Sequence, residues 1–177
     1  VELQGQTETT RSYVRNTCVL ETLLRNALGD VVRVIDFCPR FRRRGRIFRP
    51  MMFVRLVEPV AGRPVVRVRL RPTTGYGETE PQRHAGTHNI CFFTPQLRYR
   101  VTTNASRTAL SEDGWFVLDG AAAFVLGPDE TLEQTPLRIA REFLDSTIEY
   151  WQEWVRSLAI PCEWQEAVIR SAITLKL

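Results

Sequence analysis

Lysine is almost absent from this sequence. Lys176 is the single lysine among 24 basic residues, so the basic side chains are nearly all arginine. The planar guanidinium of arginine pairs with a carboxylate through two parallel hydrogen bonds. An arginine-rich block runs from Arg33 to Arg71, and acids become frequent from Glu112 onward. We therefore expect arginines of the first half to pair with acids of the second half across an internal interface.

Long apolar runs and closely spaced cysteines are also missing. No apolar run approaches the roughly 20 residues that a membrane-spanning helix needs, and residues 1–10 lack the charged-then-apolar pattern of a secretory signal. The four cysteines, Cys18, Cys38, Cys91 and Cys162, lie far apart with no CxxC spacing. This pattern predicts reduced, mostly buried thiols in a cytoplasmic protein rather than a disulfide framework.

Recognisable catalytic motifs are the third absence. The chain has no GxSxG, no Walker loop, no HExxH and no glycine-rich phosphate turn. Acids do occur close together, at Glu78 and Glu80 and at Glu112 and Asp113. Neighbouring acids on polar loops are usually solvated, so these pairs indicate no catalytic site, and no cofactor is expected.

The composition that remains is that of a globular protein. The chain has 177 residues, of which 44% are hydrophobic, a mean hydropathy of −0.20 and a net charge of +4. A chain of this length buries one sizeable core, which indicates one domain with an appendage.

Residues 1 to about 126 carry strand patterns. Tyr13–Leu24 and Val31–Phe37 flank a turn at Asn26–Asp30, which predicts a hairpin. Val65–Arg71 alternates apolar residues with arginine, as in a half-buried antiparallel strand. Further strands are expected at Met51–Glu58, Ile90–Thr94, Leu97–Thr103, Trp115–Leu118 and Ala121–Leu126, and loops at Arg40–Arg49 and Pro72–Asn89.

Helix signals begin after Gly127–Glu133. Thr135 suits an N-cap, Pro136 suits the first helical position, and apolar residues then recur three or four apart as far as Val155. A second helix is expected from about Cys162 to Leu177, where it stops on an apolar residue without a capping Gly or Asn. The fold expected is mainly β, an antiparallel β-sandwich followed by two helices. The uncovered second helix indicates a piece of a larger protein.

Three features allow a functional and a structural interpretation. His84 and His88, with Cys91 nearby, would suit a metal site if they lay on a helix, but Gly86 and the surrounding prolines favour ordinary loop histidines. The basic loop Arg40–Arg49 resembles a nucleic-acid patch, although the shortage of lysine and the acidic second half favour an exposed or interface-paired loop. The tryptophans Trp151, Trp154 and Trp164 would suit a sugar-stacking platform, but helical spacing favours a core or interface role.

With these residues in view, the sequence resembles the N-terminal region of bacterial family-fifteen glycoside hydrolases, which are glucoamylase-, glucodextranase- and trehalase-like enzymes. The closing residues Thr147–Leu177 carry the strongest similarity, to the pattern T-x-x-x-W-x-x-W…W-x-x-x-V-x-RSA-x-TLKL. The other matching stretches occur in the family's order: Asn16–Thr22, Gly29–Asp30, Val34–Pro39, Arg63–Pro72, Tyr76–Gly77 and Gly86–Ile90.

The resemblance implies a super-β-sandwich over residues 1–127, incomplete at its N-terminus, a linker helix over 128–160, and the start of a catalytic α/α barrel over 161–177. It implies inverting, exo-acting hydrolysis of α-glucosidic bonds, with a glutamic acid that protonates the leaving oxygen and a glutamate that activates water. Both glutamates would belong to the barrel, so no catalytic, cofactor-binding or metal-binding residue is expected here.

The partners implied are the protein's own C-terminal barrel and, through it, an α-glucoside substrate. Neither nucleic acid nor membrane is expected, and the oligomeric state, a homo-oligomer included, stays open. Trp151, Trp154, Trp164 and Arg170 are the residues expected at the interface with the barrel, with Arg170 paired to an acid of the barrel or the linker. The alternative is a non-enzymatic β-sandwich module that binds a glycan or a polyanion.

Overall fold

The computed structural model of the protein describes residues 1–86, 89–94, 97–161 and 163–177. The strands are β1 (Glu2–Leu3), β2 (Gln6–Tyr13), β3 (Leu20–Asn26), β4 (Val31–Phe37), β5 (Phe41–Arg43), β6 (Arg46–Phe48), β7 (Phe53–Ala61), β8 (Val65–Arg67), β9 (Gln82–Ala85), β10 (Asn89–Phe93), β11 (Arg98–Thr103), β12 (Phe116–Val117) and β13 (Ala122–Pro128). The helices are the short 3-10 turn η1 (Gly75–Gly77), α1 (Arg107–Ser111), α2 (Pro136–Arg156) and α3 (Gln165–Lys176).

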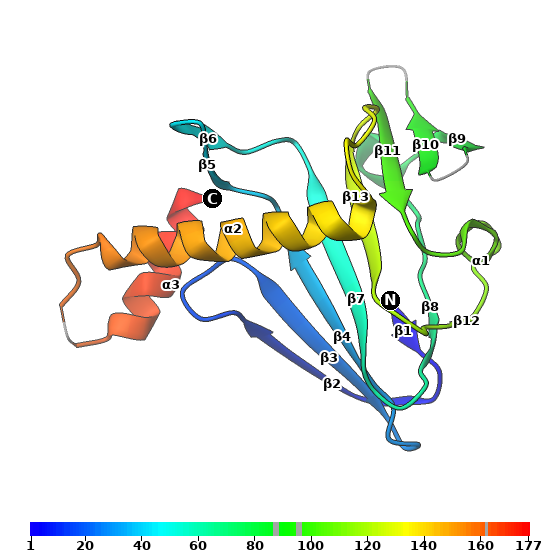
Figure 1. The fold of residues 1–177 in the computed structure, drawn as a ribbon, viewed down its shortest axis with the longest axis horizontal. Helices are drawn as coiled ribbons and strands as arrows, with labels where there is room; N and C mark the ends of the chain where they lie inside the picture. Colours follow the sequence, from blue (N-terminus) through cyan, green and yellow to red (C-terminus); the bar gives the residue numbers. More distant parts are fainter. Residues whose placement is uncertain (87–88, 95–96, 162) are drawn as a thin grey trace.

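One large antiparallel sheet organises these elements. Its strand order is β2-β3-β4-β7-β13-β11-β10-β9, while β1-β8-β12 form a small second sheet and β5 and β6 form a separate hairpin. Figure 1 shows the large sheet fanned out behind α2, which lies across its strands. The prediction of a mainly β, antiparallel fold followed by two helices is confirmed.

The large sheet is covered on both faces. One face packs against the small sheet and α1 through a core that includes Leu3, Val66 and Leu110. The opposite face packs against α2 through a second core that includes Ile35, Leu56 and Ala140. Since the central strands are buried on both sides, β4 and β13 consist of nearly continuous apolar residues rather than a strict alternation.

Helix α2 begins where the sequence predicts. Thr135 has an extended backbone at the N-cap, and Pro136 occupies the first turn. One side of the helix is buried on the sheet, and its outer side carries the charged residues. In the described part of the chain, no helix combines the length and the hydropathy that crossing a membrane requires.

The predicted hairpin around Asn26–Asp30 is confirmed as β3 and β4. The Asn26 side-chain oxygen accepts hydrogen bonds from the backbone N–H groups of Leu28 and Asp30, which fixes the turn. The expected strand Tyr13–Leu24 is wrong as a single element. The chain reverses at Asn16, whose φ is 60°, so that β2 ends at Tyr13 and β3 starts at Leu20. Asparagine tolerates this left-handed conformation better than most residues, and that preference is the only local sign of the turn.

The two predicted loops also contain regular structure. Within Pro72–Asn89, η1 and the edge strand β9 form, and all four residues of β9 are exposed, so the strand has no apolar alternation to reveal it. The basic segment Arg40–Arg49 is the hairpin β5–β6. Its turn has positive φ at Arg44 and Gly45, 52° and 74°, as in a tight two-residue hairpin turn.

The predicted alternation in Val65–Arg71 is correct in its faces although only Val65–Arg67 forms a ladder. Val66 and Val68 are buried, whereas Arg67 and Arg69 both bind the Glu2 carboxylate and Arg71 binds Asp113. The apolar side of this segment faces the sandwich core and its guanidinium groups face solvent.

Candidate functional site

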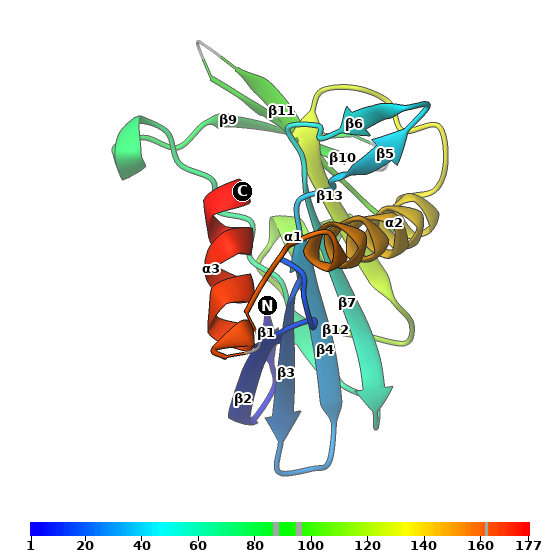
Figure 2. The same ribbon diagram turned by 90° about the vertical axis from the view of Figure 1, so that its left-hand side faces the viewer.

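The four residues expected at an interface divide into two environments. Trp151 and Trp154 lie on α2 with ring centroids 5.6 Å apart in an edge-to-face arrangement. Trp164 is the N-cap residue of α3 and Arg170 lies within that helix, and both line a groove that α3 forms with the end of β2 and the C-terminal end of α2. In Figure 2, where α2 is seen nearly end-on, α3 stands apart from it at a steep angle.

Trp151 anchors a small third core. It is fully buried together with Phe41 of the basic hairpin, Tyr150 of α2 and Ile173 of α3. It therefore joins three elements that are distant in the sequence, and it has no exposed surface left to offer to another domain. Its indole Nε1 makes no well-formed hydrogen bond with the described residues.

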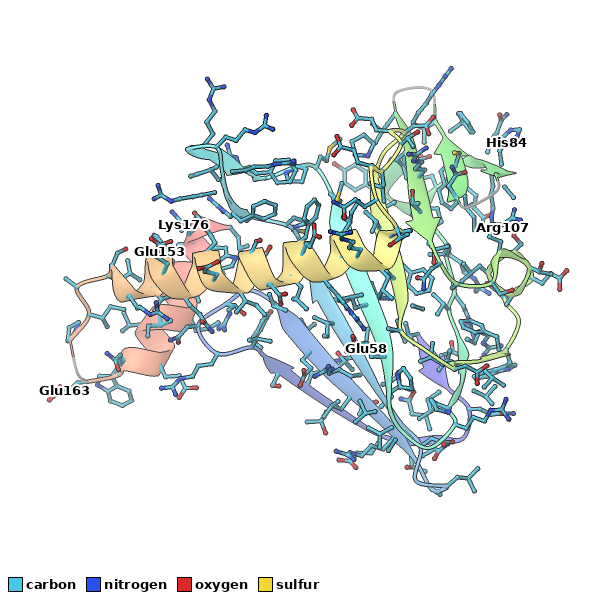
Figure 3. All side chains as sticks on the ribbon, viewed as in Figure 1. Glu58, His84, Arg107, Glu153, Glu163 and Lys176 are labelled. Atoms are coloured by element: carbon cyan, nitrogen blue, oxygen red, sulfur yellow. The ribbon has the colours of Figure 1, made fainter. Side chains whose placement is uncertain are left out.

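Trp154 is half-buried and contacts the last residue of α3, Lys176. The Lys176 Nζ lies 4.7 Å from the centroid of its ring, a cation–π contact. Figure 3 labels Lys176 at the last turn of α3, close to α2. Whether a further domain covers the remaining surface of Trp154 stays a prediction.

Arg40 also belongs to this cluster. The sequence predicted it only as the first residue of the basic segment Arg40–Arg49 and gave it no role of its own. Its guanidinium lies 5.4 Å from the Trp151 ring centroid, and its Nη1 donates a hydrogen bond of 2.9 Å to the backbone carbonyl of Lys176. A cation at a helix C-terminus also interacts favourably with the helix dipole. Arg40 therefore fastens α3 to α2 and to the hairpin, a role that no local motif announces because its partners are more than a hundred residues away.

Trp164 and Arg170 lie outside the cluster around Trp151. Trp164 is 81% exposed and has a left-handed backbone, with φ of 59°, which is uncommon for a bulky side chain. The Arg170 guanidinium lies 4.1 Å from the centroid of the Tyr13 ring. No carboxylate within the described ranges lies at ion-pair distance from Arg170, so the linker helix does not supply the expected acid.

The groove that these residues line has a volume of about 1180 Å³. The end of β2, the C-terminal end of α2 and one side of α3 form its walls. Apolar side chains line part of it and polar side chains the rest: Tyr13, Val155, Leu158, Ile160, Trp164 and Ile169, and Ser12, Arg15, Asn16, Arg156, Gln165, Glu166 and Arg170. Aromatic rings beside planar polar groups give a surface suited to stacking and hydrogen bonding.

The phenylalanines of the basic hairpin do not form a stacking surface. The Phe41 and Phe48 rings pack on each other with centroids 5.0 Å apart, and both contact Phe143 of α2. Because Phe41 is buried and Phe48 packs on Phe41 and Phe143, these rings are not arranged for base stacking, and the exposed side chains of the hairpin are its arginines and Ile47.

The histidines give no metal centre in the described part of the chain. His84 is exposed on β9, with its ring edge-to-face with Phe93 at 5.2 Å, and Figure 3 shows it at the sheet edge. No group of three or more His, Cys, Asp or Glu side chains within the described residues is arranged to hold a metal ion. His88 lies outside the described residues.

The described cysteines are free thiols but are less buried than expected. Cys18 and Cys91 are partly buried and Cys38 is exposed, while Cys162 lies outside the described residues. Burial, with a smaller contribution from Cys38, raises the pKa of the Cys18 thiol from 9.0 to about 11, and the nearby Trp151 indole N–H partly opposes the rise. Such a thiol is protonated at neutral pH and therefore a weak nucleophile.

The paired acids also lack the properties of a catalytic pair. Asp113 binds Arg71 with an Nη2–Oδ2 distance of 2.5 Å, and this hydrogen bond holds the pKa of its carboxyl below the ordinary value. A general acid at neutral pH needs a pKa raised above its ordinary value.

No family model, no curated protein and no solved structure matches this chain.

Proposed function

We propose that the chain is the N-terminal part of an inverting, exo-acting α-glucoside hydrolase similar to the family-fifteen enzymes. In this proposal residues 1–127 form the supporting sandwich, residues 128–160 the linker helix, and residues 161–177 the start of the catalytic barrel. The order of the resembling stretches along the chain supports it, and so does the antiparallel β fold followed by two helices.

The observation that carries the proposal is the apolar surface of α3 that faces solvent. Ile173 is fully buried, yet Val168, Leu175 and Leu177 on other sides of the helix are 39%, 89% and 69% exposed, and Trp164 adds to them. An apolar surface on both sides of one short helix is typical of a helix packed between two bodies. We infer that the barrel is the second body.

The chemistry assigned to the parent protein needs two glutamates outside this chain. One would protonate the glycosidic oxygen and the other would activate water on the opposite face, with the carboxyl groups about 6.5–9.5 Å apart. The role left to these 177 residues is to support the barrel and border its substrate site.

Glucose release from maltose, dextran oligomers and trehalose tests the proposal. The 177-residue chain is expected to release none. The product of the complete gene is expected to release the non-reducing-end glucose of maltose and dextran oligomers first as the β-anomer by proton NMR, and to release β- and α-glucose in equal amounts from trehalose, because only the attacked ring inverts. Turnover by the isolated chain, or first appearance of the non-reducing-end glucose as the α-anomer, would contradict the proposal.

A binding module remains the second candidate because of two observations. The groove beside Trp164 presents aromatic and polar groups together, which suits a glycan. The hairpin β5–β6 presents arginines that have no acidic partner among the described residues, which suits a polyanion. Salt-insensitive retention on an α-glucan matrix would favour the first ligand class. Binding to nucleic acid that weakens steeply with salt would favour the second.

A further inference from the structure

The arginines of the β5–β6 hairpin differ from those of the sheets. Most arginines on the sheets have an acidic partner, as in the pairs of Arg55 with Asp36 and Arg67 with Glu2. The hairpin arginines are all exposed, and none has an acidic partner within ion-pair distance among the described residues: Arg42, Arg43, Arg44, Arg46 and Arg49.

Two of these arginines are cross-strand neighbours. Arg43 lies directly opposite Arg46 in the ladder, on the face of the hairpin that also carries Phe41 and Phe48. Like charges opposite each other across a strand pair repel. The phenylalanines fix the hairpin by packing on Phe143, and the Arg43 guanidinium lies 5.8 Å from the Phe48 ring centroid. An anion between them would relieve the repulsion.

The outer face of α2 carries exposed acids that have no basic partner among the described residues. Asp145, Glu149 and Glu153 are exposed at intervals of four residues, and none of them has a basic partner at ion-pair distance in the described chain. Acids spaced by four residues on a helix are neighbours that repel each other. They follow one line of about 12 Å along the helix at 1.5 Å per residue. Figure 3 labels Glu153 towards the C-terminal half of α2.

The two surfaces lie side by side on one molecule. The hairpin packs on α2 through Phe143, on the same face of the large sheet, and Figure 2 shows β5 and β6 beside the helix. The hairpin already packs on its own helix through Phe41 and Phe48, and in the described chain no hairpin arginine forms an ion pair with an acid of that helix. A second copy of the chain, related by a two-fold axis, offers the missing partner to both surfaces at once, as an isologous dimer requires.

We propose that the chain forms a two-fold dimer in which the β5–β6 hairpin of each copy binds the Asp145–Glu153 surface of the other. The contacts are guanidinium–carboxylate pairs, and the exposed Ile47 and Met51 beside the hairpin add apolar area. The proposal is independent of the proposed enzymatic function. A dimer built on exposed ion pairs weakens with salt, since the Debye length falls from about 10 Å at 0.1 M to about 3 Å at 1 M.

Sedimentation equilibrium of the 177-residue chain tests the dimer. The wild-type chain is expected to dimerise at about 0.1 M salt, with a dissociation constant that rises about ten-fold or more at 1 M. A first variant, Arg43→Glu with Arg46→Glu, has acids on both surfaces. A second variant, Glu149→Arg with Glu153→Arg, has basic groups on both surfaces. Each is expected to be monomeric alone, and an equimolar mixture is expected to form a heterodimer with both contacts restored.

Matched controls separate this contact from general charge effects. Arg11→Glu and Glu112→Arg make the same changes at exposed positions elsewhere and are expected to leave the wild-type dissociation constant within about two-fold. Should a reversal prevent folding, Arg43→Gln with Arg46→Gln is expected to weaken the dimer about ten-fold. A monomeric wild type at low salt, a mixture that stays monomeric, or a hairpin that binds nucleic acid without dimerising would overturn the proposal.

Discussion

Trp151 and Trp164 are chemically identical side chains in opposite environments. Trp151 is fully buried among Phe41, Tyr150 and Ile173, whereas Trp164 is 81% exposed. We predict that Trp151→Ala lowers the free energy of unfolding by about 3–5 kcal/mol, because it leaves a cavity in the third core. Trp164→Ala is expected to change it by less than about 0.5 kcal/mol. Urea denaturation of both variants measures the difference, and equal losses would show that the groove side of α3 is also packed.

The raised pKa of Cys18 gives a second expectation at this scale. The unfolded chain ionises this thiol near 9.0 and the folded chain near 11, so the unfolded state binds fewer protons between those values. The stability of the folded state is therefore expected to fall as the pH rises from about 9 to about 11, and to be independent of Cys18 ionisation below that window. Chemical denaturation across the window, with Cys18→Ala as the reference that lacks this dependence, measures the effect.

Alkylation rates should distinguish Cys38 from Cys18, because the two thiols differ in burial. Cys38 is exposed and Cys18 is partly buried, so iodoacetamide at pH 8 is expected to modify Cys38 first. Mass spectrometry of the partly labelled chain reads the order. Faster labelling of Cys18 would mean that its burial is transient.

Helix α3 has one buried residue, Ile173, and is held by individual side chains. Ile173 is fully buried, Arg40 donates a hydrogen bond to the backbone carbonyl of Lys176, and Leu175 on the other side of the helix is 89% exposed. We predict that Ile173→Ala releases α3 while the large sheet stays folded, and that Leu175→Ala does not. Hydrogen exchange should then accelerate about ten-fold or more in residues 165–176 and remain unchanged in β4. Equal acceleration by both substitutions would mean that α3 is not docked through Ile173.

The elements also show which sequence signals are sufficient. The start of α2 was predictable because Thr135, Pro136 and a helical apolar pattern agree, and the β3–β4 turn was predictable because Asn26 and Gly29 favour it. The β5–β6 hairpin was not predictable as a hairpin. Its strands are three residues long, and its two phenylalanines find their partner, Phe143, in a helix almost a hundred residues later. The docking of Arg40 on α3 depends on the same long-range packing.

At the scale of the molecule, some arginines of the first half pair with acids of the second half, and others pair with acids of their own half. The expectation of pairing between the two halves is met by Arg71 with Asp113 and by Arg63 with Asp119, but Arg55 pairs within the first half, with Asp36. The sequence could not separate these cases, because strand register decides which carboxylate faces which guanidinium. Among the described residues the hairpin arginines also have no acidic partner at ion-pair distance, which is why the candidate dimer surface became visible only in the structure.

Ion pairs also connect the small sheet with the segments that flank its strands, and they predict how the whole chain responds to acid. The Glu2 carboxylate of β1 accepts hydrogen bonds from Arg67 and Arg69, and Asp113 accepts from Arg71. Hydrogen bonding to Arg67 lowers the pKa of Glu2 below 4.5, and hydrogen bonding to Arg71 lowers the pKa of Asp113 below 3.8. A lowered folded pKa gives stability that is complete above the unfolded value and is lost as the pH falls through the folded value.

Thermal unfolding between pH 7 and pH 2 should therefore separate the wild type from Glu2→Gln with Asp113→Asn. The variant is expected to unfold at a lower temperature at pH 7, because both arginine contacts lose their charged partner. As the pH falls below about 4.5, the wild type loses the same contacts by protonation, so the two curves should converge. Because the pairs are exposed, the gap at pH 7 should also shrink in high salt. A gap that is constant from pH 7 to pH 2 would mean that the side-chain amides disturb the packing of the small sheet, and that the charges of Glu2 and Asp113 do not hold it in place.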